Sequence, residues 1–228
     1  MRTSGPSGAL GPRLDALAVE VAAALPSLDG DQRRVGLAVY RLLVEGRPAT
    51  AAAVAEQLGE LVETVTPVLA TLPTATVSNG AIVAFLGLQR AEGRHVLCFG
   101  DATLATWCAW DTLFLPGLVG RAAVARSRCP TTGEEVVVEV DPVSGVTAAM
   151  PGDAVLSFLV HPAPFDGDVV AGFCRYIHFF ADPDAAQAWR SSAAEPGGGT
   201  PPELTVLSLA DGVALGTSTN RLVFGQPG

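Results

Sequence analysis

The sequence has little positive charge and no long apolar segment. Lys and Arg total 14 against 23 Asp and Glu, so the formal net charge is −9 and the isoelectric point is near 4.7. Phosphate contacts need clustered Lys and Arg, so this balance argues against a nucleic-acid partner. No run of 18 apolar residues is present, which argues against a membrane-spanning helix. The first residues also lack the apolar stretch of a secretory signal, and we therefore expect a cytoplasmic protein.

Cysteine is scarce as well, and its spacing excludes the usual paired motifs. The four cysteines stand at 98, 108, 129 and 174, and no two of them form a CxxC pair. A structural zinc site is therefore weakly supported. The chain is large, 49% hydrophobic and only 16% charged, which suits a globular core that does not depend on disulfides. We expect all four thiols to be reduced.

The first third of the chain has the pattern of a small helical module. Residues 1–12, rich in Gly, Pro and Ser, predict a flexible tail. Apolar residues at helical spacing then predict four helices, at 14–25, at 31–45, from a Thr50 cap to Leu58, and at 61–72. Two β-rich segments around Asn79-Gly80 predict a hairpin. Helices followed by a hairpin predict a winged-helix-like module over residues 13–88.

The winged-helix pattern raises the possibility of DNA binding, but the charges oppose it. The segment 61–72 would be the recognition helix, and it contains Glu63 and no Lys or Arg. A helix that reads a major groove should expose basic or amide side chains. The alternative is a structural or substrate-shielding module, since fold does not fix function.

From Leu97 onward the pattern changes to mixed helices and strands. Asp101 predicts the cap of a helix over 102–115, and Asp182-Pro183 predicts the start of another through Trp189. Further β-rich and helical segments predict strands at 122–127, 135–140, 146–149, 155–160, 175–180 and 204–207, and a closing helix at 210–222. The predicted fold is α+β, with the N-terminal module followed by a mixed α/β domain of short antiparallel sheets over residues 89–228.

Two cysteines and one carboxylate form the most informative set of residues. Cys108 and Asp111 lie in TWCAWDTLFLPGLVGR, and Cys174 follows 66 residues later in GFCRYIHFF. On a helix, residues i and i+3 share a face, so Asp111 is expected beside Cys108. Thiolates select soft metals, and a carboxylate can carry a proton. The alternative is an amphipathic core helix with an ordinary buried cysteine.

Three motifs in this region resemble the organomercurial lyase (alkylmercury lyase) family. They are Trp107-Cys108-Ala109-Trp110-Asp111-Thr112-Leu113 with Pro116, Leu118, Gly120 and Arg121; Ser127, Cys129, Thr132 and Gly133; and Phe173, Cys174, His178, Phe179 and Phe180. The resemblance extends over about residues 80–222. The sequence departs from the family at Arg175, where some members carry a second cysteine, and at Trp110, which is often Leu.

The resemblance implies protonolysis of a carbon–mercury bond to a hydrocarbon and Hg(II). Carried over by position, Cys108 and Cys174 are the mercury ligands, and Asp111, at the same metal, moves the proton. The resemblance makes residues 89–228 the catalytic domain and implies no cofactor. It also implies product Hg(II) on the two sulfurs, release assisted by external thiols, and a mercuric reductase as acceptor. We expect Trp107, Trp110 and Phe173 to form an apolar pocket for the organic group.

The chemistry of these side chains is consistent with that role. Thiolates bound to mercury increase the electron density on the attached carbon, but each thiol must first lose its proton. A buried aspartate has a raised pKa, so Asp111 could accept that proton near neutral pH and return it to carbon.

Several alternatives remain open from the sequence. The chain could bind or sense a soft metal such as mercury without cleaving anything, or Cys108, Asp111 and a histidine such as His178 could form a cysteine hydrolase. His178 is otherwise a core histidine or a metal-binding partner of Cys174. Cys129 is expected to be structural, and Cys98 is either a buried strand residue or a secondary mercury thiol.

Overall fold

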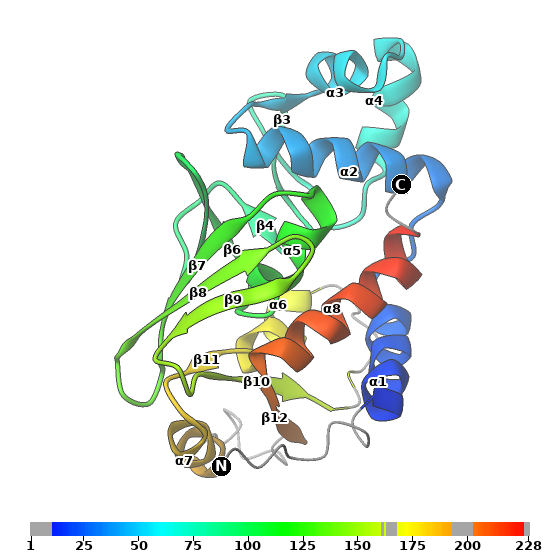
Figure 1. Cartoon of the computed structure of the whole chain (residues 1–228). Coiled ribbons are helices and arrows are strands. Elements are labelled where there is room, and N and C mark those ends of the chain that lie inside the picture. The colour runs from blue at the N-terminus through cyan, green and yellow to red at the C-terminus, as the bar shows by residue number, and fades with distance from the viewer. Residues whose placement is uncertain (1–10, 161, 163–167, 193–202, 226–228) are drawn as a thin grey trace.

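A computed structural model of the chain describes residues 11–160, 162, 168–192 and 203–225 (Figure 1). Residues 1–10 of the predicted tail lie outside these ranges, and Gly11 already begins the first helix. None of the helices in the described part of the chain is both long and apolar enough to cross a bilayer.

The N-terminal region contains the four predicted helices, within a few residues of their expected ends. They are α1 (Gly11–Ala24), α2 (Gly30–Val44), α3 (Ala51–Leu58) and α4 (Val62–Ala70). A capping box starts α2, because Asp29 accepts from the Gln32 amide at 2.8 Å and the Gln32 side chain accepts from the Asp29 amide at 3.1 Å. Thr50 caps α3 as predicted, accepting from the Ala53 amide at 3.2 Å.

Most strands belong to one large antiparallel sheet. In the described ranges its order is β1-β3-β4-β6-β5-β7-β8-β9, with β2 paired to the other edge of β3. The strands are β1 (Ala49–Thr50), β2 (Thr76–Ser78), β3 (Ala81–Phe85), β4 (Leu88–Gln89), β5 (His95–Phe99), β6 (Ala102–Thr106), β7 (Ala123–Arg128), β8 (Glu135–Asp141) and β9 (Gly145–Met150). Pairing of β4 with β6 makes the sheet continuous across the predicted boundary at residue 88.

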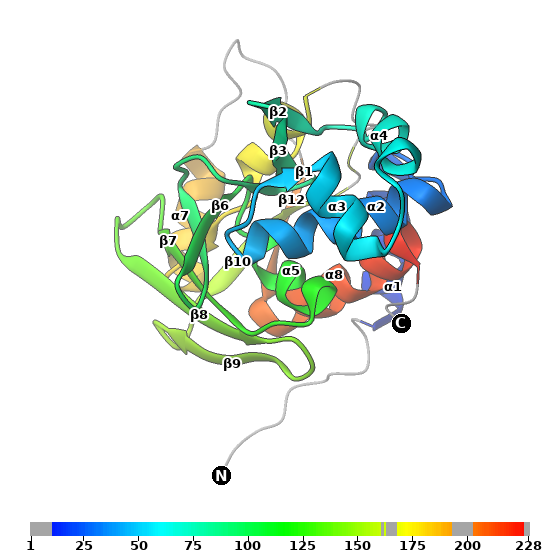
Figure 2. The ribbon, with the colours of Figure 1, turned by 90° about the horizontal axis from the view of Figure 1, so that it is seen from above.

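The described part of the chain also contains a smaller antiparallel sheet and four further α-helices. The sheet has the order β11-β10-β12, from Phe179–Phe180, Val155–Leu159 and Leu204–Ser208. The helices are α5 (Asp111–Val119), α6 (Val169–Gly172), α7 (Pro183–Ser192) and α8 (Leu209–Phe224). Helix α8 packs against both α1 and α5, and α2 contacts α5 from above (Figures 1 and 2). The predicted α+β class is therefore confirmed. The winged-helix identity of the first module and its boundary at residue 88 stay predictions.

Two local predictions are wrong. No helix covers 102–115, because Gly100-Asp101 is the turn of a hairpin in which Phe99 pairs with Ala102, and Ala102–Thr106 is strand β6. Helix α5 begins only at Asp111. The segment 175–180 is extended only at its end, since Cys174–Tyr176 is a short 3₁₀ turn. Both cysteines of the candidate site therefore lie in connecting segments rather than within regular α-helix or strand.

Candidate active site

Asp111 lies beside Cys108, but for a different reason than the predicted shared helix. Cys108 is in the connection between β6 and α5, and Asp111 is the first residue of α5. The Asp111 carboxylate turns back and its Oδ2 accepts from the Cys108 amide at 2.8 Å. Thr106 and Thr112 hold the same turn, donating from their hydroxyls to the carbonyls of Cys108 and Ala109 at 2.8 and 2.7 Å.

A second set of hydrogen bonds fixes the segment that carries Cys174. The Ala109 amide, next to Cys108, donates to the Ile177 carbonyl at 3.2 Å and joins the two segments directly. Ser157, on β10, donates its hydroxyl to the Tyr176 carbonyl at 2.7 Å and accepts from the His178 amide at 2.9 Å. These contacts hold together two cysteines that are far apart in the sequence.

The three candidate residues form one buried cluster. One ligand atom from each of Cys108, Asp111 and Cys174 lies within 4.8 Å of the other two. Their exposed fractions are 0%, 6% and 3%. Two sulfurs and one carboxylate oxygen at this separation can hold a soft metal ion.

Burial favours the neutral form of all three groups. It raises the pKa of Asp111 to about 7, although the amides of Cys108 and Trp107 and the Cys108 thiol oppose the rise by hydrogen bonding. Burial, a hydrogen bond with Cys174 and the Asp111 charge raise the pKa of Cys108 well above its usual value. For Cys174 the hydrogen bond with Cys108 lowers the pKa, but burial and the Asp111 charge outweigh it, and the net shift is upward. The carboxylate is therefore the group that exchanges a proton near neutral pH.

An apolar cavity opens beside this cluster. Trp107, Trp110 and Phe173, the three predicted pocket residues, all line it together with Asp111 and Cys174. The volume open to the centres of water-sized molecules is about 40 Å³, and since roughly 10–15 Å³ on this measure holds one water, a small organic group fits. The remaining lining residues come from helices and loops along the whole length of the chain and include Leu25, Tyr40, Leu86, Gly87, Phe114, Val169, Thr219 and Phe224.

Sequence comparisons identify the family. The sequence profile of the alkylmercury lyases matches residues 88–220. An alkylmercury lyase from Pseudomonas putida is 36% identical over 154 residues, covering 68% of this chain and 71% of the relative. One from Staphylococcus epidermidis is 35% identical over 178 residues, covering 78% of this chain and 77% of the relative. The chain belongs to the alkylmercury lyase family.

A solved structure agrees in fold with this alkylmercury lyase family member. The crystal structure described as the mercury-bound form of MerB2 superposes with a TM-score of 0.64 and 24% identity, covering 93% of this chain and 99% of that one. This likeness confirms the mixed α+β architecture. All three sequence motifs of the candidate site fall inside the matched residues 88–220.

Trp110 has a structural explanation in this alkylmercury lyase fold. Its indole N–H donates to the Gly212 carbonyl of α8 at 2.9 Å. Its ring makes edge contacts with Phe114, Phe158 and Phe173, with centroids 4.8, 5.1 and 6.2 Å away. Trp110 therefore joins α5 to α8 and closes one wall of the cavity. Arg175, the other departure from the family, stacks over the Tyr176 ring at 5.1 Å.

Of the cavity-lining residues that were not predicted from the sequence, three offer a hydroxyl or a close backbone approach. Tyr40 is on α2, Gly87 is in the turn between β3 and β4, and Thr219 is on α8. The Thr219 hydroxyl is buried without a hydrogen-bond partner in the described part of the chain. None of the three belongs to a local motif, so only the tertiary fold brings them to the site.

Among the residues that the structure describes, Cys98, Cys129, His95 and His178 lie outside the cluster. Cys129 is buried, and Cys98 is half-buried on β5 with its sulfur 3.8 Å from the Thr103 hydroxyl. His178 stacks on His95, with ring centroids 5.7 Å apart, and meets the edge of Trp189 at 5.2 Å. No hydrogen bond between His178 and Cys108 is found among the described residues, so the geometry does not favour a cysteine hydrolase.

The stacked histidines predict a loss of stability in acid. Burial lowers the pKa of His95 to about 3 and that of His178 to about 4 from the ordinary 6.5. The nearby positive charge of Arg94 further disfavours protonation of both rings. The unfolded chain therefore binds these protons at a higher pH than the folded chain, and stability is lost as pH falls from 6.5 toward those values. Asp111 has a raised pKa, so its contribution to the free energy of unfolding increases as pH falls toward its ordinary pKa.

Comparison of the unsubstituted protein with His178→Phe isolates the contribution of His178 to the loss of stability in acid, because Asp111 is present in both proteins. Between about pH 7 and about pH 5, we expect the unfolding free energy of His178→Phe to fall by about 2 kcal/mol less than that of the unsubstituted protein. Denaturant titrations at both pH values measure this difference. Equal losses in the two proteins would contradict the assignment of a neutral His178.

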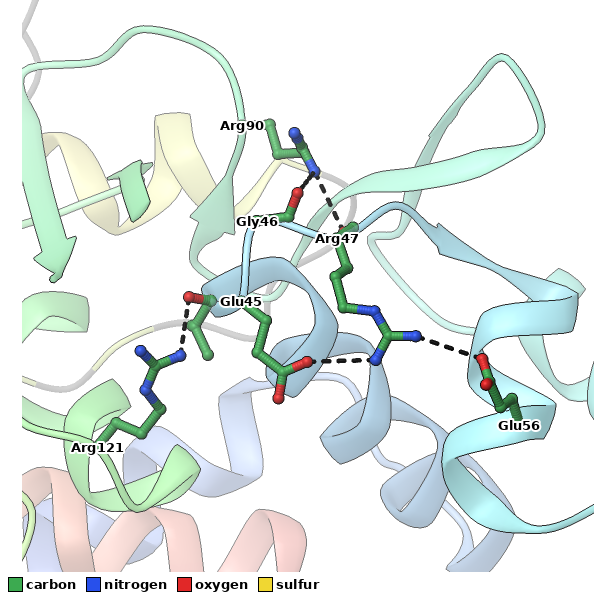
Figure 3. A network of polar contacts seen from close by, with 7 residues as sticks. Glu45, Gly46, Arg47, Glu56, Arg90 and Arg121 are labelled. Carbon is green, nitrogen blue, oxygen red and sulfur yellow. Dashed lines mark hydrogen bonds and ion pairs between the residues drawn. The ribbon is translucent and has the colours of Figure 1, made fainter. Parts of the chain in front are cut away.

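Three arginines bind carbonyls and carboxylates around the C-terminal end of α2, the helix that carries Tyr40 (Figure 3). Arg121, the last residue of the first family motif, donates to the Val44 carbonyl at 3.1 Å. Arg90 donates to the carbonyls of Gly46 and Arg47, both at 3.2 Å. The Arg47 guanidinium also makes ion pairs with Glu45 and Glu56 at 3.4 Å. Arg121, two residues after the end of α5, thus binds the C-terminal carbonyl of α2, where a cation is favourable.

Proposed function

We propose that this chain cleaves organomercury compounds by protonolysis, with Cys108 and Cys174 as mercury ligands and Asp111 as the proton carrier. The observation that carries the proposal is the buried cluster of these three residues, within 4.8 Å of one another at the wall of an apolar cavity. Family membership supplies the reaction class, and the cluster supplies the two thiols and the acid that the reaction needs.

The first step forms one mercury–sulfur bond. The Cys108 thiol hydrogen-bonds to Asp111, and it gives its proton to the ionised carboxylate as its sulfur binds mercury. The group previously bound to mercury leaves as an anion. Burial makes a free Cys108 thiolate unfavourable, so proton loss coupled to metal binding avoids a charged intermediate.

The second step breaks the carbon–mercury bond. The Cys174 sulfur binds mercury and increases the electron density on the attached carbon. The electron pair of the breaking carbon–mercury bond stays on this carbon and accepts the proton from Asp111. The Cys174 proton passes to the vacated carboxylate. The balance is one organomercury cation, two thiols and one carboxylate giving a hydrocarbon, mercury bound to two sulfurs and a carboxylic acid.

This scheme needs no cofactor, because the chain itself supplies the thiols and the acid. The apolar cavity beside Asp111 would hold methyl, alkyl or phenyl groups through Trp107, Trp110 and Phe173. External thiols would exchange with the two cysteines and release Hg(II), and a mercuric reductase is the proposed acceptor. A cytoplasmic location, where thiols remain reduced, belongs to the same proposal.

The direct test is incubation of the reduced protein with phenylmercury and excess cysteine, followed by measurement of benzene. We expect catalytic benzene formation, with mercury recovered as a thiol complex. Tight mercury binding without benzene would instead assign the chain to soft-metal binding or sensing, and a DNA mobility-shift assay would then test a regulatory role. Helix α4, which contains Glu63 and no Lys or Arg, is not suited to DNA binding.

A further inference from the structure

We infer that the Leu86-Gly87 turn positions the proton carrier, with Gly87 holding the Asp111 carboxylate against the Cys108 amide and Tyr40 holding the turn. The inference rests on the proposed function and adds to it a role for the N-terminal helices. It makes Gly87 and Tyr40 positioning residues, since they act on the reaction through Asp111.

Gly87 is in direct contact with the carboxylate. A Cβ at residue 87 would lie 2.6 Å from Asp111 Oδ1 and 2.8 Å from Cγ, both closer than real contacts allow. The other side of the carboxylate accepts from the Cys108 amide. The glycine backbone therefore covers one face of the carboxylate closely and leaves no room for a side chain.

The turn itself is strained and held from two directions. Phe85 pairs with Leu88, so Leu86 and Gly87 form a two-residue hairpin loop, and both have positive φ, at 30° and 93°. A positive φ at leucine is costly and persists only where neighbouring contacts enforce it. The buried Tyr40 hydroxyl donates to the Leu86 carbonyl at 2.6 Å, and the Trp107 amide donates to the Gly87 carbonyl at 2.9 Å. Helix α2 and the segment before Cys108 thus fix the turn over Asp111.

The chain offers a matched control for Gly87. Asn79 and Gly80 form the equivalent two-residue loop between β2 and β3, with φ of 50° and 74°. A Cβ at Gly80 would meet no atom within 4 Å. Gly80→Ala and Gly87→Ala therefore introduce the same kind of backbone strain, and only Gly87→Ala places a Cβ against the carboxylate.

The test compares Gly87→Ala with Gly80→Ala in turnover of phenylmercury across neutral pH and in titration with Hg(II) alone. For Gly87→Ala we expect kcat to fall about 100-fold, since a displacement near 1 Å has effects of this size. We also expect a shifted pH–rate midpoint and unchanged Hg(II) stoichiometry. Gly80→Ala should stay within about twofold of the parent, as surface changes usually do. A parental rate and midpoint in Gly87→Ala, or an equal loss in Gly80→Ala, would overturn the inference.

A stability cycle gives a readout that is independent of turnover. Removing the carboxylate makes room for a Cβ at 87, so Gly87→Ala should lower Tm less in an Asp111→Ala background than in the parent. Equal Tm losses would contradict the contact. If Gly87→Ala does not fold in either background, Tyr40→Phe tests the same inference. We expect its kcat to be about tenfold lower than that of the parent, with a shifted midpoint of the pH–rate profile. A parental kcat and midpoint would refute the role of the turn. Absence of benzene from the parent protein would refute the proposed function, while the cycle would still test the contact.

Discussion

Cys108→Ser and Cys174→Ser are each expected to abolish benzene formation from phenylmercury, with a loss of at least about 10⁴-fold, as for residues that act as a unit. The reason is that neither sulfur alone provides the electron donation and the final two-sulfur mercury site. Both thiols lie in the buried cluster with Asp111, so no other described cysteine can replace either one. Single-turnover assays of hydrocarbon release measure the loss.

Cys98→Ser is the matched control for these two variants. Cys98 is half-buried on β5, where its sulfur lies 3.8 Å from the Thr103 hydroxyl and outside the cluster of Cys108, Asp111 and Cys174. We expect its turnover to be close to that of the parent protein. If Cys174→Ser kept substantial activity, the second sulfur would have to come from an external thiol, and the assignment of Cys174 as a ligand would be wrong.

Asp111→Asn is expected to reduce turnover by about 10²–10⁴-fold, the usual contribution of a positioned acid or base. Asparagine has nearly the same shape and keeps an oxygen that can accept from the Cys108 amide, so the local turn should persist. Asparagine cannot accept the thiol proton, so the substitution removes the proton carrier but leaves both sulfurs in place. We therefore expect Hg(II) binding to be retained, as measured by sulfur-to-mercury charge-transfer absorbance.

The pH dependence of the parent protein provides a second check on Asp111. Because the carboxylate must be ionised to accept the thiol proton, and burial raises its pKa to about 7, kcat/KM should fall as pH drops below about 7 and level off above it. Asp111→Asn should lack this rise in its residual activity. A parental profile in Asp111→Asn would contradict the role of Asp111 as the titrating group.

The sequence was sufficient for the local parts of this structure. Amphipathic spacing and caps predicted α1 to α4, and Asn79-Gly80 predicted the hairpin, because these signals act over a few neighbouring residues. The first part of the helix expected at 102–115 is instead strand β6 (Ala102–Thr106), the hairpin partner of β5. That pairing depends on strands β4 and β7 on either side of the hairpin, and such non-local contacts override local propensity.

The candidate site could also be predicted in part from the sequence. Motif spacing put Asp111 near Cys108, and the family resemblance added Cys174, although their assigned roles stay predictions. Helical spacing was the wrong reason for the proximity of Asp111, which follows from its hydrogen bond to the Cys108 amide. The contribution of Tyr40 and Gly87 could not be predicted, since it depends on contacts between α2, a hairpin turn and α5 that no local pattern encodes.

The most direct measurement is the isotopic composition of benzene formed from phenylmercury in heavy water. In the proposed mechanism Asp111 supplies the new hydrogen, which it obtains from thiols that exchange with solvent. We therefore expect benzene with a single deuterium from the parent protein, and formation of this product at least about 100-fold more slowly by Asp111→Asn in a single turnover. Benzene without deuterium, or mercury bound to Cys108 and Cys174 with the phenyl group still attached, would contradict protonolysis by this cluster.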